Sequence, residues 1–209
     1  ERGTADGLLI PVIVLLALGA LLGGASMIGA EWRNGTMASV LWWEPRRRRV
    51  AVAKLAASAS IAIAIAGALM VVFVLALVPT LVVHGTADGA DTDWCIALLG
   101  GAARGLGLVG LVTVLGGAVT LVTRNTAFVV GGAFIYLNVI ERALVAWKPR
   151  LASWALGENI GAFVPWAPLE NVPHGPDPAA AAIHLVVIVA IVAVVAIRSF
   201  VRRDVVLST

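Results

Sequence analysis

Charged side chains are scarce in this sequence. Asp, Glu, Lys and Arg together make up 13% of its 209 residues, whereas 60% are hydrophobic. A soluble domain carries about 25% charged residues, so a chain this poor in charge cannot cover a surface that faces water. Most of its surface must therefore face lipid. Cysteine is scarce as well, since Cys95 is alone, which excludes an intrachain disulfide and a cysteine metal site.

The sequence motifs of nucleotide-binding and hydrolytic enzymes are also missing. Neither Lys54 nor Lys148 follows a glycine, as the lysine of a phosphate-binding loop does. Neither HExxH nor GxSxG occurs. Nothing in the sequence supports catalysis by this chain alone, and we expect it to bind no metal and no cofactor.

The formal net charge of +3 at first suggests a partner such as nucleic acid. The basic residues, however, flank the apolar runs, which is the pattern of a membrane protein. We therefore expect no nucleic-acid binding.

Long apolar runs dominate the chain. A helix needs about 20 apolar residues to cross a bilayer, and five stretches qualify, at about 8–29, 52–79, 97–123, 126–147 and 179–198. They must be helices, because a backbone in lipid has to satisfy its own hydrogen bonds. The sequence thus predicts an all-α membrane protein, a bundle of five transmembrane helices that forms a single transmembrane domain over residues 1–209.

The direction of these spans follows from the basic residues. Arginines cluster at 46–49, in the turn at 124–125 and in the tail after residue 197, while the alternate side is mainly acidic. The positive-inside rule places the arginine-rich segments in the cytoplasm, so the C-terminus is predicted inside and residue 1 outside. A start outside the cell predicts one more helix before residue 1, and hence six spans in the native subunit.

Glycines at GxxxG spacing occur in two spans, at Gly19/Gly23 and Gly101/Gly105. The spacing either marks a close helix contact or reflects the general frequency of glycine in membrane helices.

The segment 29–55, GAEWRNGTMASVLWWEPRRRRVAVAKL, predicts a short helix at about 36–44. Gly35 permits a turn, Thr36 is a suitable N-cap, and Pro45 ends the helix. One helical face would carry Met37, Val40, Leu41 and Glu44. This apolar face is too large to bury within so short a loop, so we expect it to rest on lipid headgroups or on another protein.

This segment resembles the loop between the second and third helices of the ABC-2 type permeases. The matching features are a glutamate, a Gly-Thr pair, a short apolar helix, a proline, a basic cluster and a lysine that opens the next span. In this chain they are Glu31, Gly35, Thr36, Leu41, Pro45, Arg46 to Arg49 and Lys54. Two further segments are similar to the family: LVTRNT at 121–126 resembles its basic turn, and FVRRDV at 200–205 resembles its closing tail.

The resemblance implies the permease half of a bacterial ABC exporter in the cell membrane. The short helix would then be a coupling helix that docks on a separate ABC ATPase subunit, which binds ATP and Mg²⁺, and a second permease copy, identical or related, would complete the transporter. The residues that the resemblance assigns to the ATPase contact are Glu31, Gly35, Thr36, Met37, Val40, Leu41, Pro45 and Arg46. Arg46 to Arg49 can equally serve as a topogenic patch on anionic lipid, and Trp42 and Trp43 as interfacial anchors.

Two features concern the other side of the membrane. The loop at 148–178 is too apolar for a free linker, so it predicts one or two short helices followed by a proline-rich return; residues 151–164 could also form a re-entrant hairpin. Arg104 and Glu141 lie at similar heights in neighbouring spans and are predicted to form an intramembrane ion pair. Outward snorkelling of Arg104 is the alternative.

Two other function classes stay open. The same fold could serve a membrane receptor, assembly or immunity protein that moves no substrate. A secondary transporter is the third class, and it would usually show an intramembrane carboxylate or broken helices at mid-bilayer; among the acidic residues of the predicted spans, Glu141 alone offers such a carboxylate.

Overall fold

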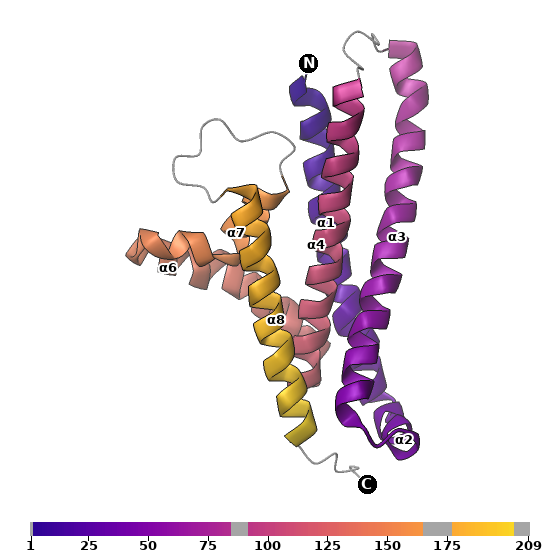
Figure 1. Ribbon diagram of the computed structural model, residues 1–209, viewed down its shortest axis with the longest axis vertical. Coiled ribbons are helices and arrows are strands. Elements are labelled where there is room, and N and C mark those ends of the chain that lie inside the picture. The colour runs from indigo at the N-terminus through magenta and orange to yellow at the C-terminus, as the bar shows by residue number, and fades with distance from the viewer. Residues whose placement is uncertain (1, 85–91, 165–176, 203–209) are drawn as a thin grey trace.

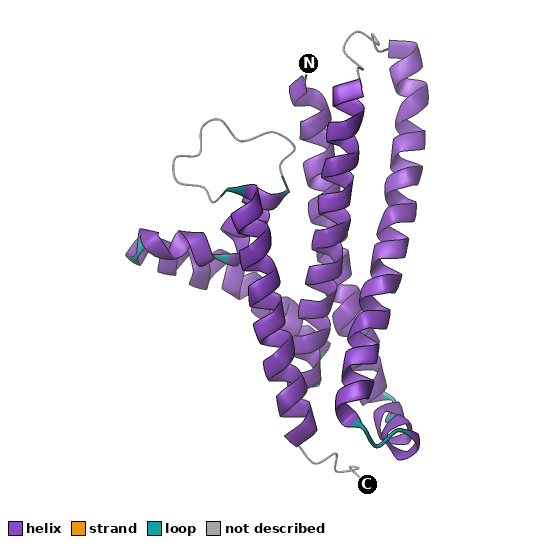
Figure 2. Ribbon diagram, in the orientation of Figure 1, coloured by secondary structure: helices purple, strands orange, loops and turns teal. Residues whose placement is uncertain are grey.

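The computed structural model describes residues 2–84, 92–164 and 177–202, and all regular structure in these ranges is helical (Figures 1 and 2). The elements in chain order are α1 (Arg2–Arg33), α2 (Thr36–Trp43), α3 (Arg47–His84), α4 (Thr92–Thr123), α5 (Thr126–Ile135), η1 (Tyr136–Ile140), α6 (Glu141–Trp147), η2 (Pro149–Trp154), α7 (Leu156–Phe163) and α8 (Pro178–Arg202).

The part of the chain that the structure describes contains five helical stretches that are long and apolar enough to cross a membrane, which confirms the predicted all-helical class and the five apolar helices. They are Val12–Arg33, Arg47–Ala76, Leu99–Thr123, Thr126–Trp147 and Pro178–Arg202. The first apolar span is predicted to end near Gly29, and the helix α1 continues beyond it to Arg33. A hydropathy pattern ends at the first charged residues, whereas a backbone helix continues until its hydrogen bonding is interrupted.

The long helices α1, α3, α4 and α8 run side by side along the long axis of the molecule (Figure 1). α4 is central and packs against α1, α3 and α8. The continuous run α5–η1–α6 leaves this bundle sideways, so that α6 points away from the other helices (Figure 1). We call one end of the bundle the α2 end, which also holds the turn at 124–125 and the last turns of α8, and we call the other the α7 end.

The tightest helix contact joins α1 to α4 through glycine. A Cβ on Gly24 would overlap the backbone carbonyl oxygen of Thr113, and a Cβ on Gly116 would overlap that of Leu21. Only glycine permits two helix backbones to approach this closely. The two GxxxG pairs identified in the sequence differ in how closely other atoms approach them. A Cβ added to Gly105 would lie 3.0 Å from Met70 Cε, whereas a Cβ added to Gly19 or Gly23 would have no atom within 4 Å.

The hydroxyl groups buried in this apolar bundle donate to their own helices. Thr113 Oγ1 donates to the carbonyl of Val109 at 2.7 Å, and Thr120 Oγ1 donates to the carbonyl of Gly116 at 2.9 Å. Such bonds satisfy a hydroxyl locally, so these threonines need no partner from another helix.

Candidate functional site

α2 is bounded by two breaks in the backbone at the α2 end. Gly35 has a φ of +68°, in the left-handed region that favours glycine, and it turns the chain from α1 into α2. Glu44 is extended, with φ −123°, as expected of a residue before proline, and α2 ends at Trp43. The predicted turn at Gly35 and the predicted stop at Pro45 are both confirmed.

The predicted N-cap role of Thr36 is wrong. Gly35 is the N-cap residue, and no side chain caps the helix. The Thr36 hydroxyl donates to the backbone carbonyl of Glu31 at 3.4 Å, so it ties α2 back to the last turns of α1. The tight αL turn brings this carbonyl within reach of the hydroxyl.

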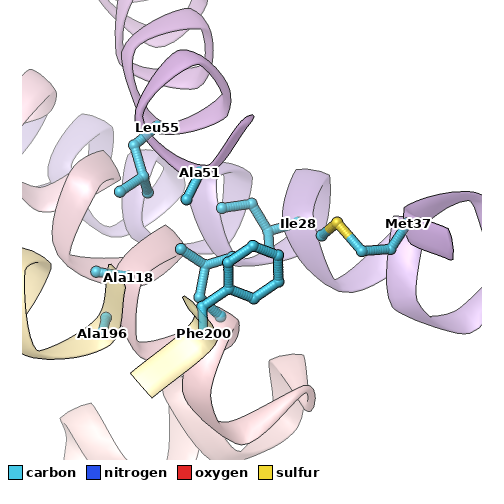
Figure 3. Close-up of a cluster of buried hydrophobic side chains, with 8 residues drawn as sticks. Ile28, Met37, Ala51, Leu55, Ala118, Ala196 and Phe200 are labelled. Atoms are coloured by element: carbon cyan, nitrogen blue, oxygen red, sulfur yellow. The ribbon is translucent and has the colours of Figure 1, made fainter. Parts of the chain in front are cut away.

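Met37 is buried by the chain itself. It is 1% exposed and belongs to a hydrophobic cluster drawn from α1, α2, α3, α4 and α8 (Figure 3). The members of this cluster are Ile28, Met37, Ala51, Leu55, Ala118, Leu121, Ala196 and Phe200. Leu41, one turn after Met37, packs against the same cluster. The expectation that the apolar face of this helix finds no cover within the chain is therefore wrong for Met37 and Leu41, because several helix ends converge beneath it.

An ion pair fixes the helices on either side of α2. Lys54 Nζ, in the second turn of α3, donates to both carboxylate oxygens of Glu31 in α1. The side chains are only 18% and 30% exposed, so solvent screens the pair less than it would a surface pair. Glu31 thus faces inward, toward α3.

Trp32 joins three segments that lie far apart in the sequence. The Arg124 guanidinium lies over its ring, 4.2 Å from the ring centroid. The Phe200 ring packs edge-on against it, with centroids 6.1 Å apart and planes at 81°. These contacts bring the 29–55 segment, the 124–125 turn and the end of α8 into one structure.

The opposite side of α2 is uncovered. Trp42 and Trp43 are each 87% exposed, and Val40 is 36% exposed. Pro45 and Arg46 follow on the surface, where the Arg46 backbone N–H donates to Glu44 Oε1 at 3.3 Å and Arg49 pairs with Glu44 at 3.8 Å. Among the residues assigned to partner contact, Gly35, Thr36, Val40, Pro45 and Arg46 are thus accessible, while Glu31, Met37 and Leu41 turn inward.

At the α7 end, the predicted short helices are present as η2 and α7. α7 packs mainly against α8. Ile160, Phe163 and the following residue Val164 belong to a cluster with Ile13 of α1, Leu108 of α4 and Leu185 of α8. All three of these helices contribute from stretches long enough to span a membrane. The re-entrant hairpin at 151–164 stays a prediction. The proline-rich return at 165–176 lies outside the described residues.

Glu141 is 6% exposed and lies at the N-terminus of α7. It follows the π-helical turn η1 and donates its backbone N–H to the carbonyl of Tyr136. Its Oε1 accepts the backbone N–H of Gly157 at 2.7 Å, while its Oε2 accepts no hydrogen bond from the described residues.

Arg104 directs its guanidinium toward Gly100, one turn nearer the start of α4, with an Nη2 atom 3.9 Å from where a Cβ on Gly100 would lie. The ion pair of Arg104 with Glu141 stays a prediction.

A second polar contact of α7 was not foreseen from the sequence. Asn159 is fully buried; its Nδ2 donates to the carbonyls of Ser153 and Ala155 at 2.9 and 2.7 Å, and its Oδ1 lies 3.3 Å from His184 Nδ1. The His184 ring also packs on Trp154, with centroids 4.5 Å apart. The sequence offered two hints, an asparagine in an apolar segment and a histidine in an apolar span. Nothing in the sequence between them predicts that these two side chains contact each other.

No family model, curated protein or solved structure matches this chain. Within residues 2–84, 92–164 and 177–202, no three His, Cys, Asp or Glu side chains gather as a metal site would require.

Proposed function

We propose that this chain is the membrane-spanning permease subunit of a bacterial ABC exporter, with α2 as its coupling helix. The single observation that carries the proposal is the convergence of the 29–55 segment, the 124–125 turn and the end of α8 on Trp32. These are the three segments that resemble the ABC-2 type permeases, and no local pattern required them to meet.

The distribution of arginine supports a cell-membrane location with the C-terminus in the cytoplasm. Arg46, Arg124 and Arg202 belong to the α2 end, although they come from three separate segments. Under the positive-inside rule this end faces the cytoplasm, where a separate ATPase subunit with its ATP and Mg²⁺ would bind.

The attachment of α2 supports its coupling role. Its inner side is fixed to the bundle through Met37 and Leu41 and through the hydrogen bond from the Thr36 hydroxyl to the Glu31 carbonyl, while Trp42 and Trp43 project from its other side. If a bound partner displaced α2, the long helices packed against it would move as well, because packed interiors transmit strain. ATP-driven closure of two ATPase subunits would thereby move two permease copies and export the substrate.

We divide the proposed contact residues into two groups by their exposure. Val40, Trp42, Trp43 and Arg46 would touch the ATPase, whereas Glu31, Met37 and Leu41 would transmit the movement inside the chain. The exposed tryptophans therefore replace Met37 and Leu41 as the apolar part of the proposed contact.

Cysteine crosslinking tests the contact. In a Cys95→Ser background, Val40→Cys should crosslink in native membranes to a protein that mass spectrometry identifies as an ATPase with a phosphate-binding loop. Met37→Cys, on the buried side of the same helix, is the matched control and should give no adduct. Adducts with lipid alone at Val40, or with proteins that bind no nucleotide, would refute the proposal.

Two measurements separate the rival classes. Co-purification with an ATPase distinguishes an ABC permease from a secondary transporter. Stimulation of that ATPase by candidate substrates distinguishes an exporter from a receptor, assembly or immunity protein.

A further inference from the structure

We propose that Trp32 and Arg124, at the α2 end, bind the phosphate of an anionic phospholipid at the membrane surface. The indole N–H and the guanidinium would donate to its oxygens. The proposal goes beyond the exporter function and does not depend on it, because it requires only that the apolar helices cross a bilayer.

The indole nitrogen of Trp32 is an unsatisfied donor. Its Nε1 is buried and has no hydrogen-bond partner in the part of the chain that the structure describes. An indole N–H can only donate, and a buried donor without an acceptor is costly. An acceptor oxygen that the described residues do not supply would remove this cost.

Arg124 supplies a positive charge beside this donor. Its guanidinium carbon lies 4.2 Å from the centroid of the Trp32 ring, so the guanidinium and the indole N–H are neighbours. No carboxylate among the described residues pairs with Arg124. Because Arg124 is exposed, its side chain can shift across the ring and let a phosphate oxygen reach the indole nitrogen. The planar guanidinium can bind two further oxygens of the same phosphate.

The backbone holds Arg124 in a conformation that a side chain disfavours. Its φ of +55° lies in the left-handed region. Strain of this kind concentrates at ligand-binding and other functional sites. The next residue, Asn125, is the N-cap of α5, so the positive end of that helix lies beside the guanidinium and also favours an anion.

The site lies at the level of lipid phosphates. The apolar span of α1 ends at Arg33 and that of α4 at Thr123, and the next span begins at Thr126. Trp32 and Arg124 adjoin these three boundaries. Apolar spans match the hydrocarbon thickness of a bilayer, and tryptophan is typical of its interface. A bilayer that these spans cross would therefore bring its phosphates to the site.

The charge balance favours an anionic lipid. Glu31 and Glu44, acidic residues at this end, are already paired with Lys54 and Arg49, so they do not neutralise Arg124. A zwitterionic lipid carries its own cation beside the phosphate, whereas an anionic lipid does not. Basic residues near the membrane surface accordingly attract anionic lipids.

Native mass spectrometry of the full chain in detergent, titrated with phosphatidylglycerol, tests the site. The first phosphatidylglycerol should bind more tightly than later ones, and more tightly than phosphatidylcholine with the same acyl chains. Arg124→Ala should weaken this first binding about tenfold or more, because hydrogen bonds between charged groups are strong. Trp32→Phe keeps an aromatic ring but loses the donor, so its loss should be smaller, though several-fold. Unchanged binding in Arg124→Ala would overturn the proposal.

Matched variants separate a site from general attraction. Arg48→Ala removes another exposed arginine of this end, and Trp43→Phe removes an exposed indole N–H. Both variants should bind phosphatidylglycerol as the wild type does, and losses equal to those of Arg124→Ala and Trp32→Phe would overturn the proposal. Displacement of the lipid by inorganic phosphate at comparable concentration would overturn it as well, since the site would then serve a free anion.

Two further measurements exclude indirect effects. Melting temperatures without phosphatidylglycerol check that each variant folds, and Arg124→Ala, at an exposed position, carries the test if Trp32→Phe does not. Asp204 lies outside the described residues, and Asp204→Asn should change the lipid affinity little. A gain of about tenfold with Asp204→Asn would identify this carboxylate as the resident acceptor and would overturn the proposal.

Discussion

Lys54 donates to both carboxylate oxygens of Glu31 and so bridges α1 and α3, the helices that precede and follow α2 in the chain. The pair is more enclosed than the other ion pair at this end, Arg49–Glu44, whose side chains are 70% and 38% exposed. The enclosed pair therefore gives a firm link between two helices, whereas the exposed one stays within the 44–49 segment.

The first prediction concerns this difference. A double-mutant cycle with Glu31→Ala and Lys54→Ala should give a coupling energy of about 1 to 2 kcal/mol, because removal of one partner leaves the other charge poorly solvated. The measurement is thermal unfolding in detergent micelles. The matched cycle with Glu44→Ala and Arg49→Ala should give about 0.2 to 1 kcal/mol, as for other exposed pairs. Equal coupling in the two cycles would contradict the structure.

The second prediction concerns the α1–α4 contact. Gly24→Ala places a methyl group against the Thr113 carbonyl oxygen and should destabilise the bundle by about 1 to 3 kcal/mol, as overpacking does. Gly19→Ala, on the same helix but with nothing within 4 Å of the new Cβ, should leave the melting temperature nearly unchanged. A similar loss in both variants would show that helix propensity, and not the close contact, governs stability.

The number of apolar helices was predictable because it depends on run length, a local property. The boundaries of α2 followed from Gly35 and Pro45 for the same reason, since each restricts its own backbone or that of its neighbour. The end of α1 at Arg33 was not predictable in this way, because charged residues such as Glu31 mark where an apolar run ends, not where a helix ends.

The site was less predictable because it depends on contacts between distant residues. Whether Met37 faces a partner or its own core is decided by Phe200 and Leu55, which no pattern in the loop reveals. Glu141 was singled out as a buried charge, but its position at the N-terminus of α7 depends on the π-turn η1, for which the sequence Tyr136–Ile140 gives no periodic signal.

The third prediction separates the two faces of α2. Met37→Ala should destabilise the protein by about 2 to 5 kcal/mol, the usual effect of emptying a buried position. Val40→Ala, at a position that is 36% exposed, should change stability by about 0.5 kcal/mol or less. Thermal unfolding of both variants is the check, and a larger loss with Val40→Ala would mean that α2 is rotated from its described orientation.

The last prediction concerns Arg124, a residue in strained backbone. Its φ is +55°, and the left-handed conformation costs a residue with a side chain roughly 1 to 2 kcal/mol. Arg124→Ala keeps this strain and loses the cation–π contact with Trp32, worth about 0.5 to 1 kcal/mol at accessible sites. Arg124→Gly loses the same contact but adopts the turn without strain, so it should be more stable than Arg124→Ala by about 1 kcal/mol. The difference between the two variants should persist in a Trp32→Ala background, because the ring contributes nothing to either of them. If Arg124→Gly were the less stable of the two, the turn at 124–125 would not be left-handed in solution. If the difference vanished in the Trp32→Ala background, it would have to arise from the ring and not from the backbone.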